Sequence, residues 1–178
     1  MNVGRQPDDA SRATPDVLQP MRWWDVADVA ALEARVFGAT AWSAETFWSE
    51  LAAPGRAYWV VREAPATQEE DGRLLGYAGA AAAGPDADVQ TVAVDPCARG
   101  RGLGDALLSA CEVHAAHAGS TALLLEVEAG NEPAQRLYRR HGFETLARRR
   151  DYYGQGVDAL VLRRRLGGAA PHRPEETS

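Results

Sequence analysis

The segment TVAVDPCARGRGLG, residues 91–104, decides the fold, because it joins an apolar strand to a helix through a glycine-rich turn. We expect the strand over Val89–Val94 and the helix from about Gly102 to Ala118, where apolar residues recur at helical spacing. Glycines let the backbone of such a turn approach a ligand closely, and the first N–H groups of the helix point at that ligand. The turn Arg99–Gly104 therefore predicts a site for a phosphate or diphosphate.

This turn has two other interpretations. It can be a plain strand-to-helix turn without a ligand, or it can belong to a Rossmann dinucleotide site. A Rossmann motif occupies the first strand-to-helix turn of the chain, and an acidic residue follows it about 20 residues later. Here three expected strands and two expected helices come before the strand that leads into the turn, and the spacing of the turn is R-x-x-G-x-G. The sequence therefore disfavours a Rossmann site.

The other expected elements surround this unit, and their order predicts one α/β domain with a mixed, mostly antiparallel sheet of six to seven strands and about four helices. The domain covers residues 20–166, and residues 1–19 and 167–178 have the composition of flexible tails. The expected strands are Met21–Trp23, Ala57–Arg62, Leu74–Ala82, Ala122–Val127, Phe143–Arg150 and Val157–Arg163. The expected helices are one from a cap at Asp25 to Phe37, Ala44–Leu51 with a cap at Ser43, and one from a cap at Asn131 to His141.

Composition excludes several classes of protein. The chain has 178 residues, of which 46% are hydrophobic and 25% charged, so it is globular. All 19 basic residues are arginine, which excludes a lysine Schiff base and the lysine of a P-loop. The net charge of −6 disfavours nucleic acid as a partner. No apolar stretch reaches the ~20 residues of a membrane helix, no secretory signal begins the chain, and two cysteines build no disulfide framework, so we expect a cytoplasmic protein.

Glu126 is the first candidate for catalysis, because it interrupts the apolar strand ALLLEV, residues 122–127. A carboxylate among aliphatic side chains is costly unless it has a function or a partner. Burial would raise its pKa towards neutrality, which suits a general base. Strand alternation puts Leu124, Glu126 and Glu128 on one face. The alternative is an acid near a strand end that faces solvent.

Tyr138 is the second candidate, on the helix after that strand, although a core tyrosine with its hydroxyl at the boundary would give the same pattern. Cys111, His114 and His117 are spaced so that they fan around their helix, so we expect no metal site. The runs of three arginines at 148–150 and 163–165 are typical of solvated strand ends, with a basic patch for a partner as the alternative.

Together these motifs resemble the GNAT family of acetyl-CoA-dependent N-acetyltransferases. The family motif Q/R-x-x-G-x-G/A matches Arg99–Gly104, TVAVDP at 91–96 resembles its fourth strand, and NEPAQRLYRRHGF at 131–143 its late helix. The segments WSAETF at 42–47, LLEV at 124–127 and RRDYY at 149–153 resemble the members that acetylate the N-terminal alanine of ribosomal protein S18. Glu128 and Glu132 depart from the usual pattern, which bears on acceptor preference.

The resemblance implies an α/β acetyltransferase with acetyl-CoA as cosubstrate and the S18 N-terminus as acceptor. It implies that Glu126 accepts a proton and Tyr138 donates one. It implies that the acceptor lies near Trp42, Tyr152 and Tyr153. The residues that it implies for acetyl-CoA are Val92, Ala93, Val94, Arg99, Gly100, Arg101, Gly102, Leu103, Gly104, Asp105 and Asn131. Transfer to a small amine, such as a polyamine or an aminoglycoside, and a non-catalytic acetyl-CoA-binding module remain as alternatives.

Overall fold

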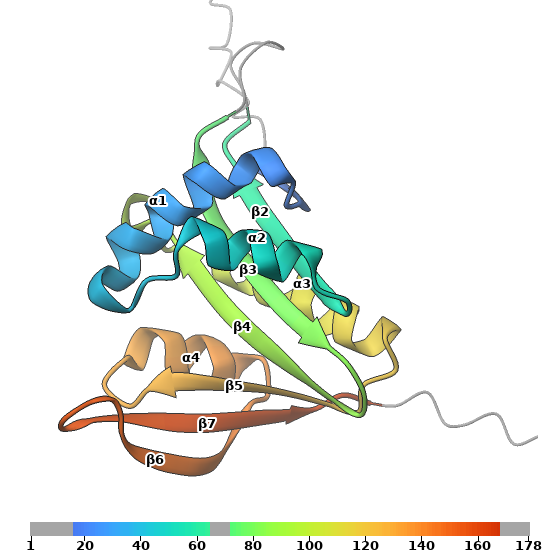
Figure 1. Ribbon diagram of the computed structural model, residues 1–178. Coiled ribbons are helices and arrows are strands. Elements are labelled where there is room, and N and C mark those ends of the chain that lie inside the picture. The colour runs from blue at the N-terminus through green and yellow to red at the C-terminus, as the bar shows by residue number, and fades with distance from the viewer. Residues whose placement is uncertain (1–15, 65–71, 168–178) are drawn as a thin grey trace, which may run out of the picture.

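The computed structural model describes residues 16–64 and 72–167, which form one seven-stranded sheet with helices on both faces (Figure 1). The strands are β1 (Val17–Pro20), β2 (Arg56–Arg62), β3 (Leu74–Ala82), β4 (Asp86–Val94), β5 (Ala122–Glu128), β6 (Glu144–Gly154) and β7 (Val157–Arg165). The α-helices are α1 (Val26–Phe37), α2 (Ala44–Ala52), α3 (Leu103–His117) and α4 (Glu132–Arg140), and three short 3-10 helices are η1 (Trp23–Asp25), η2 (Gly38–Thr40) and η3 (Pro96–Ala98). This architecture confirms the predicted fold class.

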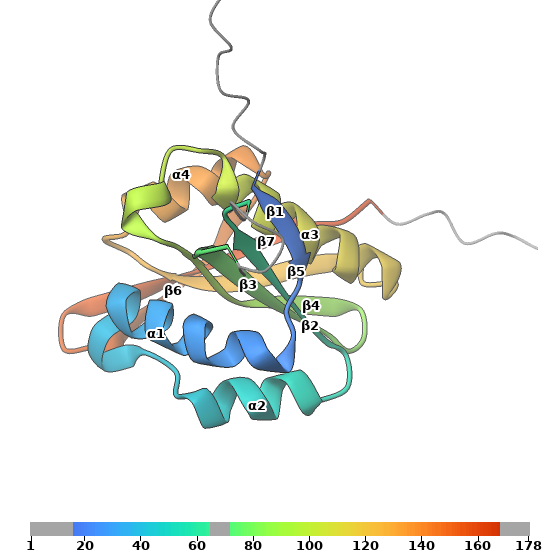
Figure 2. The same ribbon diagram turned by 90° about the horizontal axis from the view of Figure 1, so that it is seen from above.

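The strand order is β1-β2-β3-β4-β5-β7-β6, and every neighbouring pair is antiparallel except β4 and β5. Helices α1 and α2 cover one face of the sheet, and α3 and α4 cover the other (Figure 2). Two groups of buried apolar residues fill the space between sheet and helices, one under α1 and α2 and one under α3 and α4. The central strand β3 is thus buried on both faces, whereas every residue of the edge strand β6 is exposed.

Local signals begin the helices where the sequence predicted. The Ser43 hydroxyl accepts a hydrogen bond from the Thr46 N–H at 3.3 Å at the start of α2. Asn131 caps α4 in the same way, with its side-chain oxygen 3.2 Å from the Ala134 nitrogen. After α4 the chain turns at Gly142, whose φ of +77° is easy only for glycine. The predicted caps at Ser43 and Asn131 are confirmed.

The start of the domain differs from the prediction. The predicted strand Met21–Trp23 is wrong, because Trp23 begins η1, and the first strand is instead Val17–Pro20, inside the segment predicted to be a tail. β1 pairs with β2 at the sheet edge. The rest of the predicted tails, residues 1–15 and 168–178, lies outside the described residues.

Asp25 stands at the predicted helix start, but its side chain does not cap α1. It is 1% exposed, accepts the Arg22 N–H at 2.7 Å and binds the guanidinium of Arg62 on β2 at 2.7 Å. Arg62 also donates to Asp28 and to the carbonyl oxygen of Gly72. A buried carboxylate needs such a partner. Asp25 therefore ties the start of α1 to β2.

Candidate active site

The sheet opens between β4 and β5. The two strands pair only through Asp86–Ala122, Ala87–Leu123 and Asp88–Leu124, all near their first residues. Beyond these pairs β4 follows β3 and β5 follows β7, so the two strands diverge (Figure 1). Peptide groups of Val92–Val94 that face β5 therefore have no strand to pair with in the described part of the chain. This edge inside the sheet can donate and accept hydrogen bonds along an extended ligand.

A bulge in β4 contributes to the opening. The register between β3 and β4 shifts where Gly79 and Ala80 face Thr91 and Val89, which leaves Gln90 as the extra residue. Before the bulge Val89 packs with the α3 side of the core, and after it Ala93 packs with the α1 side. The bulge bends the strand and changes which side chains face each layer.

The glycine-rich turn follows β4 and closes the far end of the opening. Gly100 and Gly102 have φ of +79° and +78°, and a Cβ added at either would meet nothing within 4 Å. No side chain caps α3, and its first helical hydrogen bond comes from Ala106 to the Gly102 carbonyl oxygen. The N–H groups of the first turn are therefore available to an anion. The turn has the geometry predicted for a phosphate site.

Helix α4 flanks this turn, because a Cβ at Gly104 would lie 3.2 Å from the Leu137 side chain. Arg101 of the turn and Asp105, which follows the turn, have partners of their own. Arg101 binds Asp16 at 2.7 Å, and Asp105 binds Arg140 at 2.9 Å. The predicted contacts of Arg99, Arg101, Asp105 and Asn131 with a coenzyme remain predictions.

Tyr138 lies on α4 with 8% of its surface exposed and packs edge-on against Phe143, with ring centroids 5.8 Å apart. It belongs to the same apolar cluster as Leu103 of the turn and Leu125 of β5. Burial raises the pKa of its hydroxyl well above the ordinary value, and the neighbouring Cys111 and Tyr153 add to the shift. The side chain therefore stays protonated at neutral pH, as a proton donor must.

Glu126 is not buried, so the expectation that this acid lies among the aliphatic side chains of the core is wrong. Strand alternation turns Leu125 and Val127 into the core and leaves the Glu126 side chain 38% exposed on the other face. It lies on β5 just beyond the last residue paired with β4, where the two strands begin to diverge. Its carboxylate binds Arg149 of β6, with Oε1 and Nη1 2.9 Å apart. The geometry is that of an accessible acid held by one arginine.

Arg149, which belongs to an arginine run predicted to be a solvated strand end, links Glu126 to two of the residues predicted to contact the acceptor. Its guanidinium lies 4.2 Å above the ring of Tyr152, which packs edge-on against Tyr153. Burial raises the pKa of Tyr153 to about 12, and the charges of Tyr152, Glu126 and Glu128 contribute. The aromatic pair therefore lies beside the acidic face of β5.

The pKa of Asp88 on β4 is also affected by Glu126. Burial raises the pKa of Asp88, and the negative charges of Glu126 and Asp86 raise it further. The start of the opening thus carries several carboxylates, which favours a positively charged acceptor over an anionic one.

Trp42, the third residue predicted to contact the acceptor, lies between η2 and α2. Its ring packs against Phe47 at 5.6 Å, and its backbone N–H donates to Glu33 Oε1 at 3.1 Å. Glu33 is 2% exposed, and its Oε2 has no hydrogen-bond partner among the described residues. Burial raises the pKa of Glu33 to about 7, although the hydrogen bond from Trp42 acts to lower it. Sequence analysis missed this acid, although its spacing from Val26, Val29 and Val36 places it on the buried face of α1.

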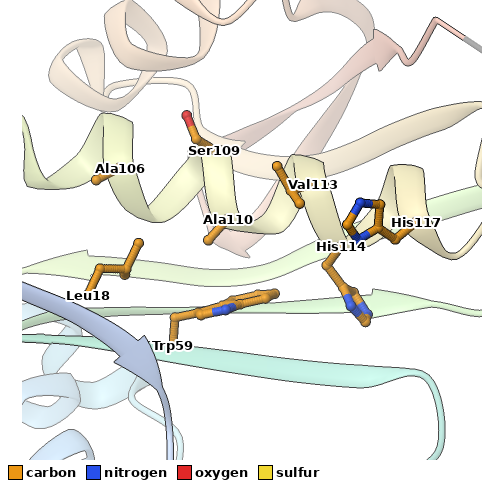
Figure 3. Close-up of a pocket in the computed structure, with 8 residues that line it drawn as sticks. All are labelled: Leu18, Trp59, Ala106, Ser109, Ala110, Val113, His114 and His117. Atoms are coloured by element: carbon orange, nitrogen blue, oxygen red, sulfur yellow. The ribbon is translucent and has the colours of Figure 1, made fainter.

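Other features of the described residues lie apart from this site. A cavity of about 440 Å³ lies between α3 and β2, lined among others by Leu18, Trp59, Val113 and His114 (Figure 3). Residues 16–64 and 72–167 contain no group of three or more His, Cys, Asp or Glu arranged to hold a metal ion. In the same ranges no helix is long and apolar enough to span a membrane.

Comparison with known proteins agrees with this geometry. Residues 23–143 match the acetyltransferase (GNAT) family, and the chain belongs to this family. A Bacillus subtilis protein with the provisional name ribosomal protein bS18-alanine N-acetyltransferase is 32% identical, over 84% of this chain and 95% of its own length. The Mycobacterium tuberculosis N-alpha-acetyltransferase RimI is 37% identical, over 80% and 88%. A longer Mycobacterium leprae protein is 39% identical, and the chain spans 41% of its length.

A solved structure extends this likeness to the whole fold. The ribosomal-protein-S18-alanine N-acetyltransferase of Escherichia coli superimposes with a TM-score of 0.74 and 26% identity, over 89% of this chain and 99% of that one. The family and the fold that the sequence resembles are therefore confirmed.

Proposed function

We propose that this protein transfers an acetyl group from acetyl-CoA to the N-terminal α-amine of a protein, with the N-terminal alanine of ribosomal protein S18 as acceptor. The names of the Bacillus subtilis relative and of the Escherichia coli structure support this acceptor. The observation that carries the proposal is the opening between β4 and β5, with a glycine-rich turn at one end and Glu126 and Tyr138 on β5 and α4 beside it.

The residues of the opening fit acetyl-CoA. The open N–H groups at the start of α3 suit a diphosphate, and the free edge of Val92–Val94 suits the amide groups of a pantetheine arm. When bound, acetyl-CoA supplies a thioester carbonyl that an amine can attack. A β4 N–H near Val94 can donate to the carbonyl oxygen as negative charge develops on it.

Proton transfer would be divided between two side chains. An α-amine has a pKa near 7.7–8.0, so a base must take a proton before the amine can attack. Glu126 is accessible for this, directly or through water, and Arg149 holds its carboxylate. Tyr138 is protonated at neutral pH, so it can pass its proton to the leaving sulfur while it regains one from the nitrogen, which loses its second proton as the amide forms. Cys111 is buried with its pKa raised to about 12, which does not suit a nucleophile.

A small amine is the second candidate, because carboxylates of Asp88, Glu126 and Glu128 also suit a polyamine or an aminoglycoside. Thiol release from acetyl-CoA separates the two. A peptide with the S18 N-terminal sequence should be turned over at least tenfold more efficiently, by kcat/KM, than spermidine or kanamycin. The same peptide with a blocked N-terminus is the control. Faster turnover of the small amines would overturn the proposed acceptor, and CoA binding without turnover of any amine would indicate a binding module.

A further inference from the structure

The proposed phosphate site contains an acid, Asp105, whose negative charge disfavours the binding of a phosphate. Asp105 is the third residue of α3 and lies in the first turn of the helix. A carboxylate there stabilises a helix, but it also repels an anionic ligand. Its charge therefore has to be balanced if the turn is to bind a diphosphate.

Two basic side chains at the end of α4 contact this carboxylate. Arg140 Nη2 lies 2.9 and 3.0 Å from the two oxygens of Asp105, and His141 Nε2 lies 3.2 Å from Oδ1. Partial burial acts to raise the pKa of Asp105, but the hydrogen bonds from Arg140 and His141 outweigh it and lower the pKa. Asp105 is thus an anion held by the neighbouring helix.

His141 also has a second carboxylate partner. Its Nδ1 lies 2.8 Å from Oε1 of Glu112, two turns further along α3, and the side chain is only 12% exposed. Glu112 in turn contacts Arg164 of β7. A neutral imidazole has one N–H and can donate to one of the two acids, whereas an imidazolium donates to both. The geometry of the ring therefore fits the protonated form.

The net charge of the groups around the His141 ring depends on whether the ring is protonated. Asp105 and Glu112 come from α3, Arg140 from α4 and Arg164 from β7. The two carboxylates and two arginines cancel in formal charge, so the proton on His141 decides whether the cluster is neutral or positive. Because the cluster includes the first turn of α3, that charge acts on whatever the turn binds.

We propose that His141 is a positioning residue of the coenzyme site, which as an imidazolium holds Asp105 and Glu112 and adds a positive charge beside the phosphate-binding turn. This inference rests on the proposed function, since it takes acetyl-CoA as the ligand. Binding of CoA should therefore weaken when the charge at this position is removed and recover when a permanent positive charge replaces it.

Calorimetric titration with CoA tests this, using the full chain at about pH 7. His141→Gln, which keeps a hydrogen-bonding side chain but carries no charge, should bind CoA about two- to fivefold more weakly than wild type. His141→Arg, which keeps the positive charge, should bind CoA about as tightly as wild type.

His117→Gln is the matched control, because His117 lies at the other end of α3. Its CoA affinity should equal that of wild type. Wild-type affinity in His141→Gln, or equal weakening in His141→Gln and His141→Arg, would overturn the inference and leave the proposed function standing. Absence of CoA binding by wild type would overturn both.

Discussion

Gly102→Ala tests directly whether the turn before α3 binds phosphate. Gly102 has a φ of +78°, and an added Cβ would meet nothing within 4 Å, so the fold bears only the strain of a left-handed alanine. That strain is about 1–2 kcal/mol, which lowers the Tm by about 2–8 °C in a domain of this size. The methyl group would also hold a ligand away from the N–H groups. Losing one hydrogen bond to a charged group, about 1.5–3 kcal/mol, weakens CoA binding about 10- to 150-fold.

Gly119→Ala is the matched control for this substitution. Gly119 follows α3, has a φ of +80°, and its added Cβ would also meet nothing within 4 Å. The two variants should therefore lose similar Tm in differential scanning calorimetry. Only Gly102→Ala should lose CoA affinity in a calorimetric titration. Equal CoA affinities in the two variants would refute the assignment of the turn as the phosphate site.

Tyr138→Phe should lower kcat about 100-fold or more and leave CoA affinity unchanged, because the packing against Phe143 is kept; unchanged thiol release would exclude Tyr138 as the proton donor. Glu126→Gln should lower kcat/KM for the S18 peptide about 100-fold or more, whereas Glu128→Gln, on the same strand face, should leave it close to wild type; the opposite result would make Glu128 the base. Burial raises the pKa of Glu33 from 4.5 to about 7. At a pH between these two values the folded protein keeps a proton on Glu33 that the unfolded protein has lost. The wild-type protein therefore loses stability as the pH rises through this range. Glu33→Gln cannot titrate, so its free energy of unfolding relative to wild type should rise by about 1–3 kcal/mol from about pH 5 to about pH 8 in urea denaturation; a difference that does not change with pH would contradict this.

Features that depend on neighbours in the sequence were predictable. The strand Leu74–Ala82 has the predicted bounds, and the caps at Ser43 and Asn131 form as their residue types indicate. The glycine-rich turn was predictable for the same reason, because Gly100 and Gly102 supply the left-handed backbone that its geometry requires.

Features that depend on distant partners were not predictable. The opening between β4 and β5 arises because only three residue pairs join these two strands. The remaining residues of β4 pair with β3, and those of β5 pair with β7. The short edge strand Val17–Pro20 has too few residues for a periodic pattern, and its pairing with β2 defines it.

Glu126 and Glu33 also show what could not be predicted from neighbouring residues in the sequence. The aliphatic surroundings of Glu126 suggested burial, but a strand alternates its faces, and those neighbours point the other way. The acid that is buried with a raised pKa is Glu33, on a helix, where the 3.6-residue period places it on the core face. Whether a single side chain is buried therefore depends on the periodicity of its helix or strand and not on the residues next to it in the sequence.

Locating the transferred acetyl group is the most direct test of acetylation at an α-amine. Tandem mass spectrometry of the S18 N-terminal peptide, after incubation with acetyl-CoA and the full chain, identifies the modified nitrogen. We expect one acetyl group on the N-terminal amine of alanine, and none on a peptide whose N-terminus is blocked. An acetyl group on a side chain, or an unmodified peptide in a reaction that acetylates small amines, would contradict the account.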